Sequence, residues 1–182
     1  MKNEYETKVL EIDVSAIQAK LQAIGAKLDW EEKTLMRRRV YDIEAHQWGN
    51  GKWFRLREVA GKTTLTYKER GGTEIGATKE VEVEIGNFED MAAILQQLER
   101  NTTAYQENKR TTYLYEDTEI CIDSRPKIPT YLEIEWPDTE SVQKTLKLLE
   151  LEGRDVGDMG VIEIYEKYGM DLHSYKVLTF ND

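Results

Sequence analysis

The stretch Asn3-Glu-Tyr-Glu-Thr-Lys-Val9, near the start of the chain, sets two acids and a base at alternate positions. Successive residues of a β-strand point to opposite faces, so Glu4, Glu6 and Lys8 would share one face. Two carboxylates beside an ammonium group suit a divalent metal ion together with an anion that the metal binds. The motif is short, and the later strands decide how it is interpreted.

The same alternation continues in the predicted strands that follow. In Trp53-Phe-Arg-Leu-Arg57, the two arginines share one face, and Phe54 and Leu56 share the other. Arg38 has the opposite parity to its two neighbours, and we expect it at the surface. Acids or bases occupy one face of several other strands and of a predicted hairpin at 108–123: Arg37 and Arg39, Lys68 and Arg70, Glu80 and Glu82, Arg110 and Asp123, and Glu133 and Glu135.

Two architectures are consistent with such strands. An ordinary antiparallel sheet has one face on the core and one charged face in water. The charged faces here, however, use Glu, Arg and Lys almost exclusively, and acids and bases are sorted onto different strands. Like charges at alternate positions of a strand repel unless a cation or a polyanion lies between them. A sheet closed into a barrel, with this charged face inward and helices outside, would enclose a charged tunnel.

Apolar residues recur at helical spacing in four segments, which predicts four helices. The first follows Asp13, a suitable N-cap, and covers 17–28; the next two cover 91–98 and 142–149. The fourth, 161–168, either packs against the barrel or plugs one end of the tunnel. We expect packing, because amphipathic helices usually bury their apolar stripe.

Composition bounds the class of protein. A chain of 182 residues without a linker or repeat predicts one domain, 1–182. With 40% hydrophobic and 33% charged residues, no apolar run near 18 residues and no visible signal peptide, we expect a cytoplasmic protein with no membrane contact. Cys121 has no disulfide partner, and neither His46 nor His173 has an acid–base partner nearby in the sequence. The net charge of −10 argues against a nucleic-acid partner.

Five motifs, in order along the chain, resemble the CYTH superfamily, also called the triphosphate tunnel metalloenzymes. They are Glu4-x-Glu6-x-Lys8, Arg55-x-Arg57, Leu65-Thr-Tyr-Lys68, Glu80-x-Glu82 and Ile122-Asp-Ser-Arg-Pro-Lys-Ile-Pro-Thr-Tyr-Leu-Glu-Ile-Glu135. The resemblance implies an α+β fold in which a closed antiparallel eight-stranded β-barrel binds a triphosphate with divalent cations. Where the family often carries a Gly-Leu-Gly-like turn before its late acidic pair, this chain carries Arg125-Pro-Lys-Ile-Pro129.

Carried over residue by residue, the resemblance also implies roles. The candidate ligands of Mg²⁺ or Mn²⁺ are acids from early and late strands: Glu4, Glu6, Asp123, Glu133 and Glu135. The candidate substrate-binding residues are Lys8, Arg55, Arg57, Lys68, Glu80, Glu82 and Arg110, to which we add the strand-face bases Arg37, Arg39 and Arg70. The candidate catalytic residues are Glu4, Glu6 and Lys8.

Three functions could use such a tunnel. One is hydrolysis of a triphosphate, such as tripolyphosphate, ATP or thiamine triphosphate. Another is cyclisation of ATP to cyclic AMP and pyrophosphate, and a third is binding without turnover. The family that the chain resembles includes class IV adenylyl cyclases, thiamine triphosphatases and inorganic triphosphatases. We favour hydrolysis because it needs the fewest additional features. The sequence is also compatible with a homodimer.

Overall fold

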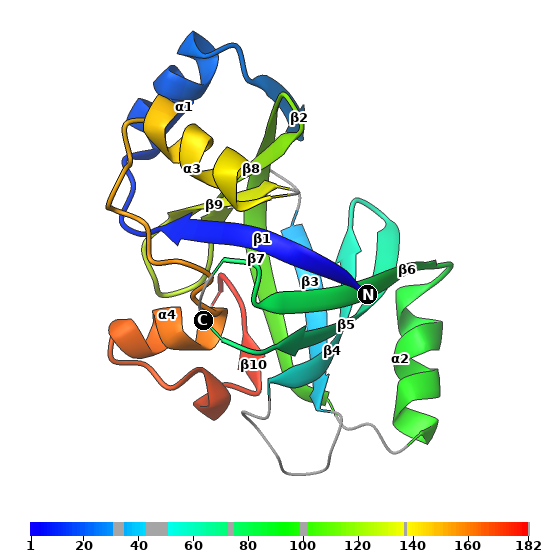
Figure 1. The fold of residues 1–182 in the computed structure, drawn as a ribbon. Coiled ribbons are helices and arrows are strands. Elements are labelled where there is room, and N and C mark those ends of the chain that lie inside the picture. The colour runs from blue at the N-terminus through cyan, green and yellow to red at the C-terminus, as the bar shows by residue number, and fades with distance from the viewer. Residues whose placement is uncertain (31–34, 43–50, 73–74, 99–101, 137, 182) are drawn as a thin grey trace.

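The computed structural model describes residues 1–30, 35–42, 51–72, 75–98, 102–136 and 138–181 (Figure 1). His46 lies outside these residues. The strands are β1 Lys2–Val9, β2 Lys27–Trp30, β3 Leu35–Asp42, β4 Lys52–Val59, β5 Lys62–Arg70, β6 Thr78–Ile85, β7 Thr102–Tyr115, β8 Thr118–Ser124, β9 Tyr131–Trp136 and β10 Val177–Leu178. The helices are α1 Val14–Ala23, α2 Phe88–Gln97, α3 Thr139–Leu148 and α4 Val161–Lys167, with a 3₁₀ turn, η1, at Leu172–Ser174.

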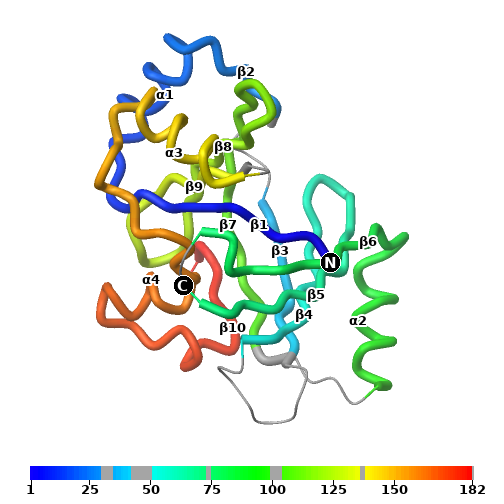
Figure 2. The backbone as a smooth tube through the Cα atoms, in the orientation of Figure 1, coloured from blue at the N-terminus to red at the C-terminus, as the bar shows by residue number. Residues whose placement is uncertain are grey.

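Eight antiparallel strands close into a ring, which confirms the predicted barrel. The hydrogen-bonded order is β7-β3-β4-β5-β6-β1-β9-β8, and β8 pairs again with β7. Closure depends on the length of β7: its first half pairs with β3 and its second half with β8. The short strands β2 and β10 also pair with β7, and Figure 2 shows the C-terminal segment returning to β7 through β10.

The pairing register sets which side chains point into the ring. Residues directly opposite each other in an antiparallel pair point to the same face. Arg55 lies opposite Thr66, which in turn lies opposite Glu82. Leu56, one residue later, points outward and is fully buried beneath α2. Charged side chains therefore fill the interior of the ring, and apolar side chains cover its outside.

The helices bury the apolar outer face in separate clusters. Helices α1 and α3 cover β1, β8 and β9 through a cluster that includes Leu21, Leu146 and Ile134, and α2 covers β3 and β4 on another side of the ring (Figure 1). Burial of each such Leu or Ile stabilises the fold by roughly 2 kcal/mol. None of the described helices is long and apolar enough to cross a membrane.

The four predicted helices are found with shifted boundaries, and the end of α1 differs most. Asp13 caps α1 as predicted and accepts a hydrogen bond from Ala16 N at 3.0 Å. The prediction that this helix continues to Leu28 is wrong, because α1 ends at Ala23 and Leu28 lies in β2. Gly25, with φ +82°, adopts the left-handed conformation that commonly follows a helix C-terminus.

Candidate functional site

The ring encloses a cavity of about 690 Å³. Residues of β1, β3–β9, α4 and η1 line it. Its charged lining includes most of the predicted site residues, namely Glu4, Glu6, Lys8, Arg55, Arg57, Lys68, Arg70, Glu80, Glu82, Arg110, Glu133 and Glu135. Three other predicted site residues, Arg37, Arg39 and Asp123, are not part of this lining.

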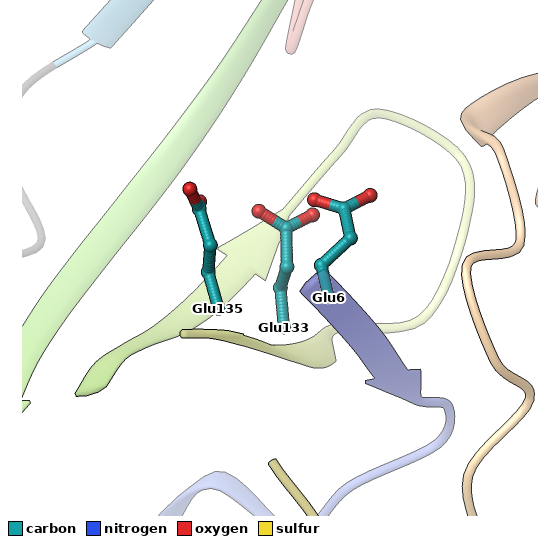
Figure 3. Close-up of side chains that lie close together, drawn as sticks. All are labelled: Glu6, Glu133 and Glu135. Carbon is teal, nitrogen blue, oxygen red and sulfur yellow. The ribbon is translucent and has the colours of Figure 1, made fainter. Parts of the chain in front are cut away.

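Three carboxylates meet on the wall formed by β1 and β9. Glu6 lies opposite Glu135 in the ladder, and Lys8 lies opposite Glu133, so alternation brings all four side chains into the cavity. One oxygen from each of Glu6, Glu133 and Glu135 lies within 4.8 Å of the others, and Figure 3 shows the three side chains projecting together. Carboxylate oxygens are the ligands that Mg²⁺ and Mn²⁺ prefer. The residues present therefore fit a divalent metal.

The charge states of these carboxylates differ. Burial raises the pKa of Glu135 to about 7, and the charges of Glu133 and Glu6 add to the effect. Burial also opposes ionisation of Glu133, but Arg110 and Lys8 outweigh it and lower the pKa of Glu133 below its usual value. The wall thus combines a carboxylate that stays ionised with one that protonates near neutral pH unless a cation neutralises it.

Lys8 is the central cation of the acidic wall. Its Nζ lies 2.6 Å from Glu6, 3.5 Å from Glu133 and 3.9 Å from Asp158. Burial alone would lower the pKa of Lys8, but Glu6 and Glu133 raise it above its usual value. The ammonium group therefore stays charged and holds the carboxylates close together.

Glu4 lies apart from the three clustered carboxylates. Its two oxygens accept from Lys68 Nζ at 2.6 and 2.8 Å, and Lys68 also lies 3.3 Å from Glu80. Burial raises the pKa of Glu4 to about 8, although Lys68 opposes the shift. The structure thus places Glu4 beside the basic side chains that β4 and β5 direct into the cavity, Arg55, Arg57 and Lys68, which we call the basic wall. Glu6 is the acid of the first motif that lies with Glu133 and Glu135.

The basic wall has donors without close acidic partners. The nearest carboxylate of Arg55 and Arg57 among the described ion pairs is Glu82, at 3.7 and 3.6 Å. Arg55 lowers the pKa of Arg57 to about 10, and burial and Arg110 add to the effect. Among the described side chains, Arg55 Nε is buried without a hydrogen-bond partner. These groups suit a polyanion that enters the cavity.

Asp123 has a supporting position. It is fully buried, and its two oxygens accept from Arg110 at 2.8 and 2.5 Å. Arg110 in turn donates to Glu133 at 2.7 Å. Asp123 therefore orients Arg110 against the carboxylate wall and does not belong to the group of three carboxylates.

The positions of the β3 arginines correct the prediction. Arg37 points outward, where its Nε lies 2.9 Å from Glu58 and its guanidinium covers the ring of Phe88 in α2. Arg39 shares this outer face, so neither lies in the tunnel. Arg38, expected at the surface, is buried and lines the cavity. Alternation alone separated the two faces of β3 but did not say which one points inward.

The C-terminal segment contributes an end wall. In α4, Ile164 and Tyr165 pack in the apolar cluster, while Ile162 and Glu163 line the cavity. Arg70 Nη2 donates to Glu163 at 2.5 Å, which links the barrel to this helix. The helix therefore packs as expected and also borders the tunnel. His173, for which no role was expected, lines the cavity as well.

Sequence reasoning missed Asp158. The backbone of Lys8 pairs with Val156 and Gly157, which places this segment along β1. Asp158 accepts from Thr78 Oγ1 at 2.7 Å, and burial, together with Glu6, raises its pKa to about 7. A single acid in a loop between glycines gives no alternating pattern, so only the tertiary structure reveals it.

The comparisons agree with this geometry. The CYTH domain family model matches residues 2–154, so the chain belongs to the CYTH domain family. Proteins of this family typically act on triphosphates and generally depend on divalent metals. No curated protein sequence matches the chain.

Solved structures share the fold at low identity. The PH1012 protein from Pyrococcus horikoshii is 21% identical, with a TM-score of 0.74 over 88% of this chain and 98% of that one. A candidate adenylate cyclase from Vibrio parahaemolyticus is 16% identical, with a TM-score of 0.77 over 91% and 98%. HpAC1 from Hippeastrum, described as a candidate adenylyl cyclase with a dominant triphosphatase activity, is 18% identical, with a TM-score of 0.64 over 94% and 99%.

Proposed function

We propose that the chain is a divalent-metal-dependent triphosphatase that hydrolyses an inorganic or small organic triphosphate inside the tunnel. One observation carries the proposal: the Glu6–Glu133–Glu135 carboxylates and a wall of arginines and lysines line the same cavity. A triphosphate with its metal ion needs both surfaces, because the cation binds carboxylates and the phosphate oxygens bind cationic donors.

Different side chains of the cavity would bind the phosphate oxygens and orient the groups that bind them. Arg55 and Arg57 hold phosphate oxygens, since guanidinium groups bind such oxygens through paired hydrogen bonds. Arg110, fixed by Asp123, and Lys68, fixed by Glu4, add positive charge at defined positions. Lys8 keeps Glu6 and Glu133 close together despite their repulsion. Phosphoryl transfer requires mainly such positioning and charge stabilisation from the protein.

Glu6, Glu133 and Glu135 are the residues that would hold Mg²⁺ or Mn²⁺. When bound, the metal neutralises charge on the phosphates and promotes attack by water. The products of hydrolysis at the terminal phosphorus are orthophosphate and the shortened phosphate chain.

Cyclisation of ATP is a second candidate, and apolar residues of the cavity favour it. Trp53, Val161, Ile162 and Leu172 line the cavity together with the charged residues. Such surfaces suit the organic part of a ligand, including a nucleobase. The description of HpAC1 supports placing hydrolysis first, because it couples the cyclase fold with a dominant triphosphatase activity.

Product analysis separates these candidates. The protein is incubated with tripolyphosphate, ATP or thiamine triphosphate, with Mg²⁺, Mn²⁺ or a chelator. Metal-dependent orthophosphate release supports hydrolysis, whereas cyclic AMP with pyrophosphate supports cyclisation. Binding without any product contradicts both enzymatic functions. Exposed Glu152→Gln serves as the control for the buried Glu133→Gln, which we expect to abolish turnover.

A further inference from the structure

Arg38 and Arg125 are buried arginines that face the tunnel without an acidic partner. Arg38 is 8% exposed, and its Nε and Nη2 donate to Gln106 Oε1 at 3.0 and 2.5 Å. Arg125 is 7% exposed, and its Nε donates to the Tyr131 hydroxyl at 2.8 Å. Both line the cavity. Within the described parts of the chain, neither guanidinium forms an ion pair with a carboxylate.

The surrounding charges increase the cost of the Arg38 cation in particular. Arg38 lies directly opposite Arg57 in the β3–β4 ladder, an arrangement in which like charges repel. Burial lowers the pKa of Arg38 well below its usual value, and Arg125 and Arg55 add to this effect. Burial opposes the charge of Arg125 too, but Tyr131 and Asp123 outweigh it and raise the pKa of Arg125 above its usual value. Asp123 also favours the charged form of Arg38, but Arg110 already binds both Asp123 oxygens. A buried charge without a counter-charge is costly to the fold.

The two arginines are also held in place. Gln106, opposite Arg38 on β7, accepts from two of its nitrogens and so fixes the plane of the guanidinium. Arg125 begins the turn between β8 and β9, and the Tyr165 hydroxyl of α4 donates to the carbonyl oxygen of Pro126 at 2.7 Å. Gln106 and Tyr131 orient the two guanidinium groups, and among the described residues neither group has a carboxylate partner of its own, which is the arrangement expected of a preformed oxyanion site.

We propose that Arg38 and Arg125 form an oxyanion subsite of the tunnel, which binds one phosphoryl group beside Arg55. The subsite extends the basic wall to β3, through Arg38 in place of the predicted Arg37 and Arg39, and to the turn at 125–129, which supplied no residue to the predicted binding set. Its assignment to a phosphoryl group of the substrate rests on the proposed triphosphatase function. Free orthophosphate has the same chemistry, and the experiment separates the two sources.

Calorimetric titration of the metal-free protein tests the subsite. Tripolyphosphate and orthophosphate are titrated separately into the wild type, Arg38→Gln and Arg125→Gln. We expect each variant to bind tripolyphosphate roughly tenfold more weakly or worse, the scale of one charge-assisted hydrogen bond. Arg39→Gln is the matched control, one residue further along β3 on the outer face, and should bind as the wild type does.

The outcomes separate the alternatives. A loss confined to orthophosphate assigns the subsite to the free product and overturns its assignment to the substrate. Wild-type affinity of both variants for both anions contradicts the subsite altogether. If the wild type binds tripolyphosphate through Arg38 but releases no product with any metal, the proposed triphosphatase function fails and the subsite stands.

Thermal unfolding distinguishes binding from a structural role. Without ligand, Arg38→Gln should unfold at the same temperature as the wild type or higher, because an uncompensated buried charge is removed. Saturating tripolyphosphate should then stabilise the variant less than the wild type. A structural role predicts the opposite, with a lower unfolding temperature and unchanged affinity. Arg38→Lys keeps the charge and should retain part of the affinity.

Discussion

At the scale of single residues, the acids of the tunnel fall into two groups. Some are available to bind a cation, and others already bind a basic side chain. Glu135 forms no ion pair among the described residues, and burial raises its pKa to about 7. Glu4 instead binds Lys68 through both oxygens. The two acids have the same chemistry and lie on the paired strands β1 and β9, but their neighbours give them different surroundings.

This difference predicts unequal effects on metal affinity. Glu135→Gln should weaken Mn²⁺ binding by about tenfold or more, because one of the three proposed anionic ligands loses its charge. Glu4→Gln should change it by less than about threefold, which corresponds to well under 1 kcal/mol. Calorimetric titration of each protein with Mn²⁺, without triphosphate, measures both. Equal losses in the two variants would show that Glu4 is a ligand after all.

The surroundings of Arg57 predict that its removal weakens triphosphate binding without destabilising the fold. The nearest carboxylate among its described ion pairs is 3.6 Å away and Arg55 lies beside it, so removal of Arg57 relieves repulsion. Arg57→Ala should weaken tripolyphosphate binding by roughly 2 kcal/mol. Its free energy of unfolding without ligand should not fall. Calorimetry and urea denaturation measure the two quantities, and unchanged affinity would exclude Arg57 from the phosphate-binding wall.

At the scale of elements, the junction of β4 and β5 at one end of the tunnel depends on a glycine. Gly51 has φ +72°, and a Cβ there would lie 2.5 Å from the carbonyl oxygen of Arg70. Arg70 N also donates to Gly51 O at 2.7 Å, so the two backbones cannot easily separate. The close approach holds Arg70 where it reaches Glu163 of α4.

The predicted consequence can be measured against a matched glycine. Gly61 has a similar φ of +78°, but a Cβ there would meet no atom within 4 Å. Gly61→Ala should therefore lower the free energy of unfolding by about 1 kcal/mol, the cost of the left-handed backbone alone. Gly51→Ala should lower it by at least about twice as much, because a backbone clash is added. Equal effects in urea denaturation would contradict the close approach at Gly51.

The elements themselves were largely predictable, while their orientation was not. Alternation identified the two faces of each strand. The separation of basic residues on β4 and β5 from acidic residues on β6 and β9 favoured a charged interior. For β3 the pattern was ambiguous, since three consecutive arginines put a base on both faces. Pairing with β4, which sets Arg38 opposite Arg57, decides the inward face. Register is a tertiary property and is not encoded within one strand.

At the scale of the whole molecule, the buried acids of the tunnel make the metal-free fold sensitive to pH. The pKa of Glu4 is raised to about 8, and those of Glu135 and Asp158 to about 7. The folded protein therefore holds protons that the unfolded chain has already released. Stability falls with rising pH wherever the folded state binds more protons. The loss should begin above about pH 4 to 5, where unfolded carboxyl groups ionise, and continue to about pH 8.

Denaturation with urea at pH 5.5 and pH 8, in chelator, measures this dependence. The free energy of unfolding should be lower at pH 8, and Glu4→Gln should reduce the difference. Saturating Mg²⁺ should reduce it too, because the cation favours the ionised carboxylates. Equal or greater metal-free stability at pH 8 would contradict the raised pKa values.

For the molecule as a whole, motif order predicted the family and the ring, and most inward residues followed from alternation. Asp158 and Arg125 could not be placed in this way, because each lies in a loop without a periodic pattern. Their positions depend on contacts between distant segments: the backbone of Lys8 with Gly157, and Tyr165 with Pro126. Long-range contacts of this kind complete the site.

The most direct test of the central claim is orthophosphate release from tripolyphosphate, followed while Mn²⁺ or Mg²⁺ is titrated into the wild type, Glu135→Gln and Glu152→Gln. The tunnel predicts metal-dependent release by the wild type and Glu152→Gln. For Glu135→Gln it predicts a metal requirement shifted to higher concentration. Release that is unaffected by chelator, or equal metal dependence in all three proteins, would contradict a metal-dependent triphosphatase built on the Glu6–Glu133–Glu135 wall.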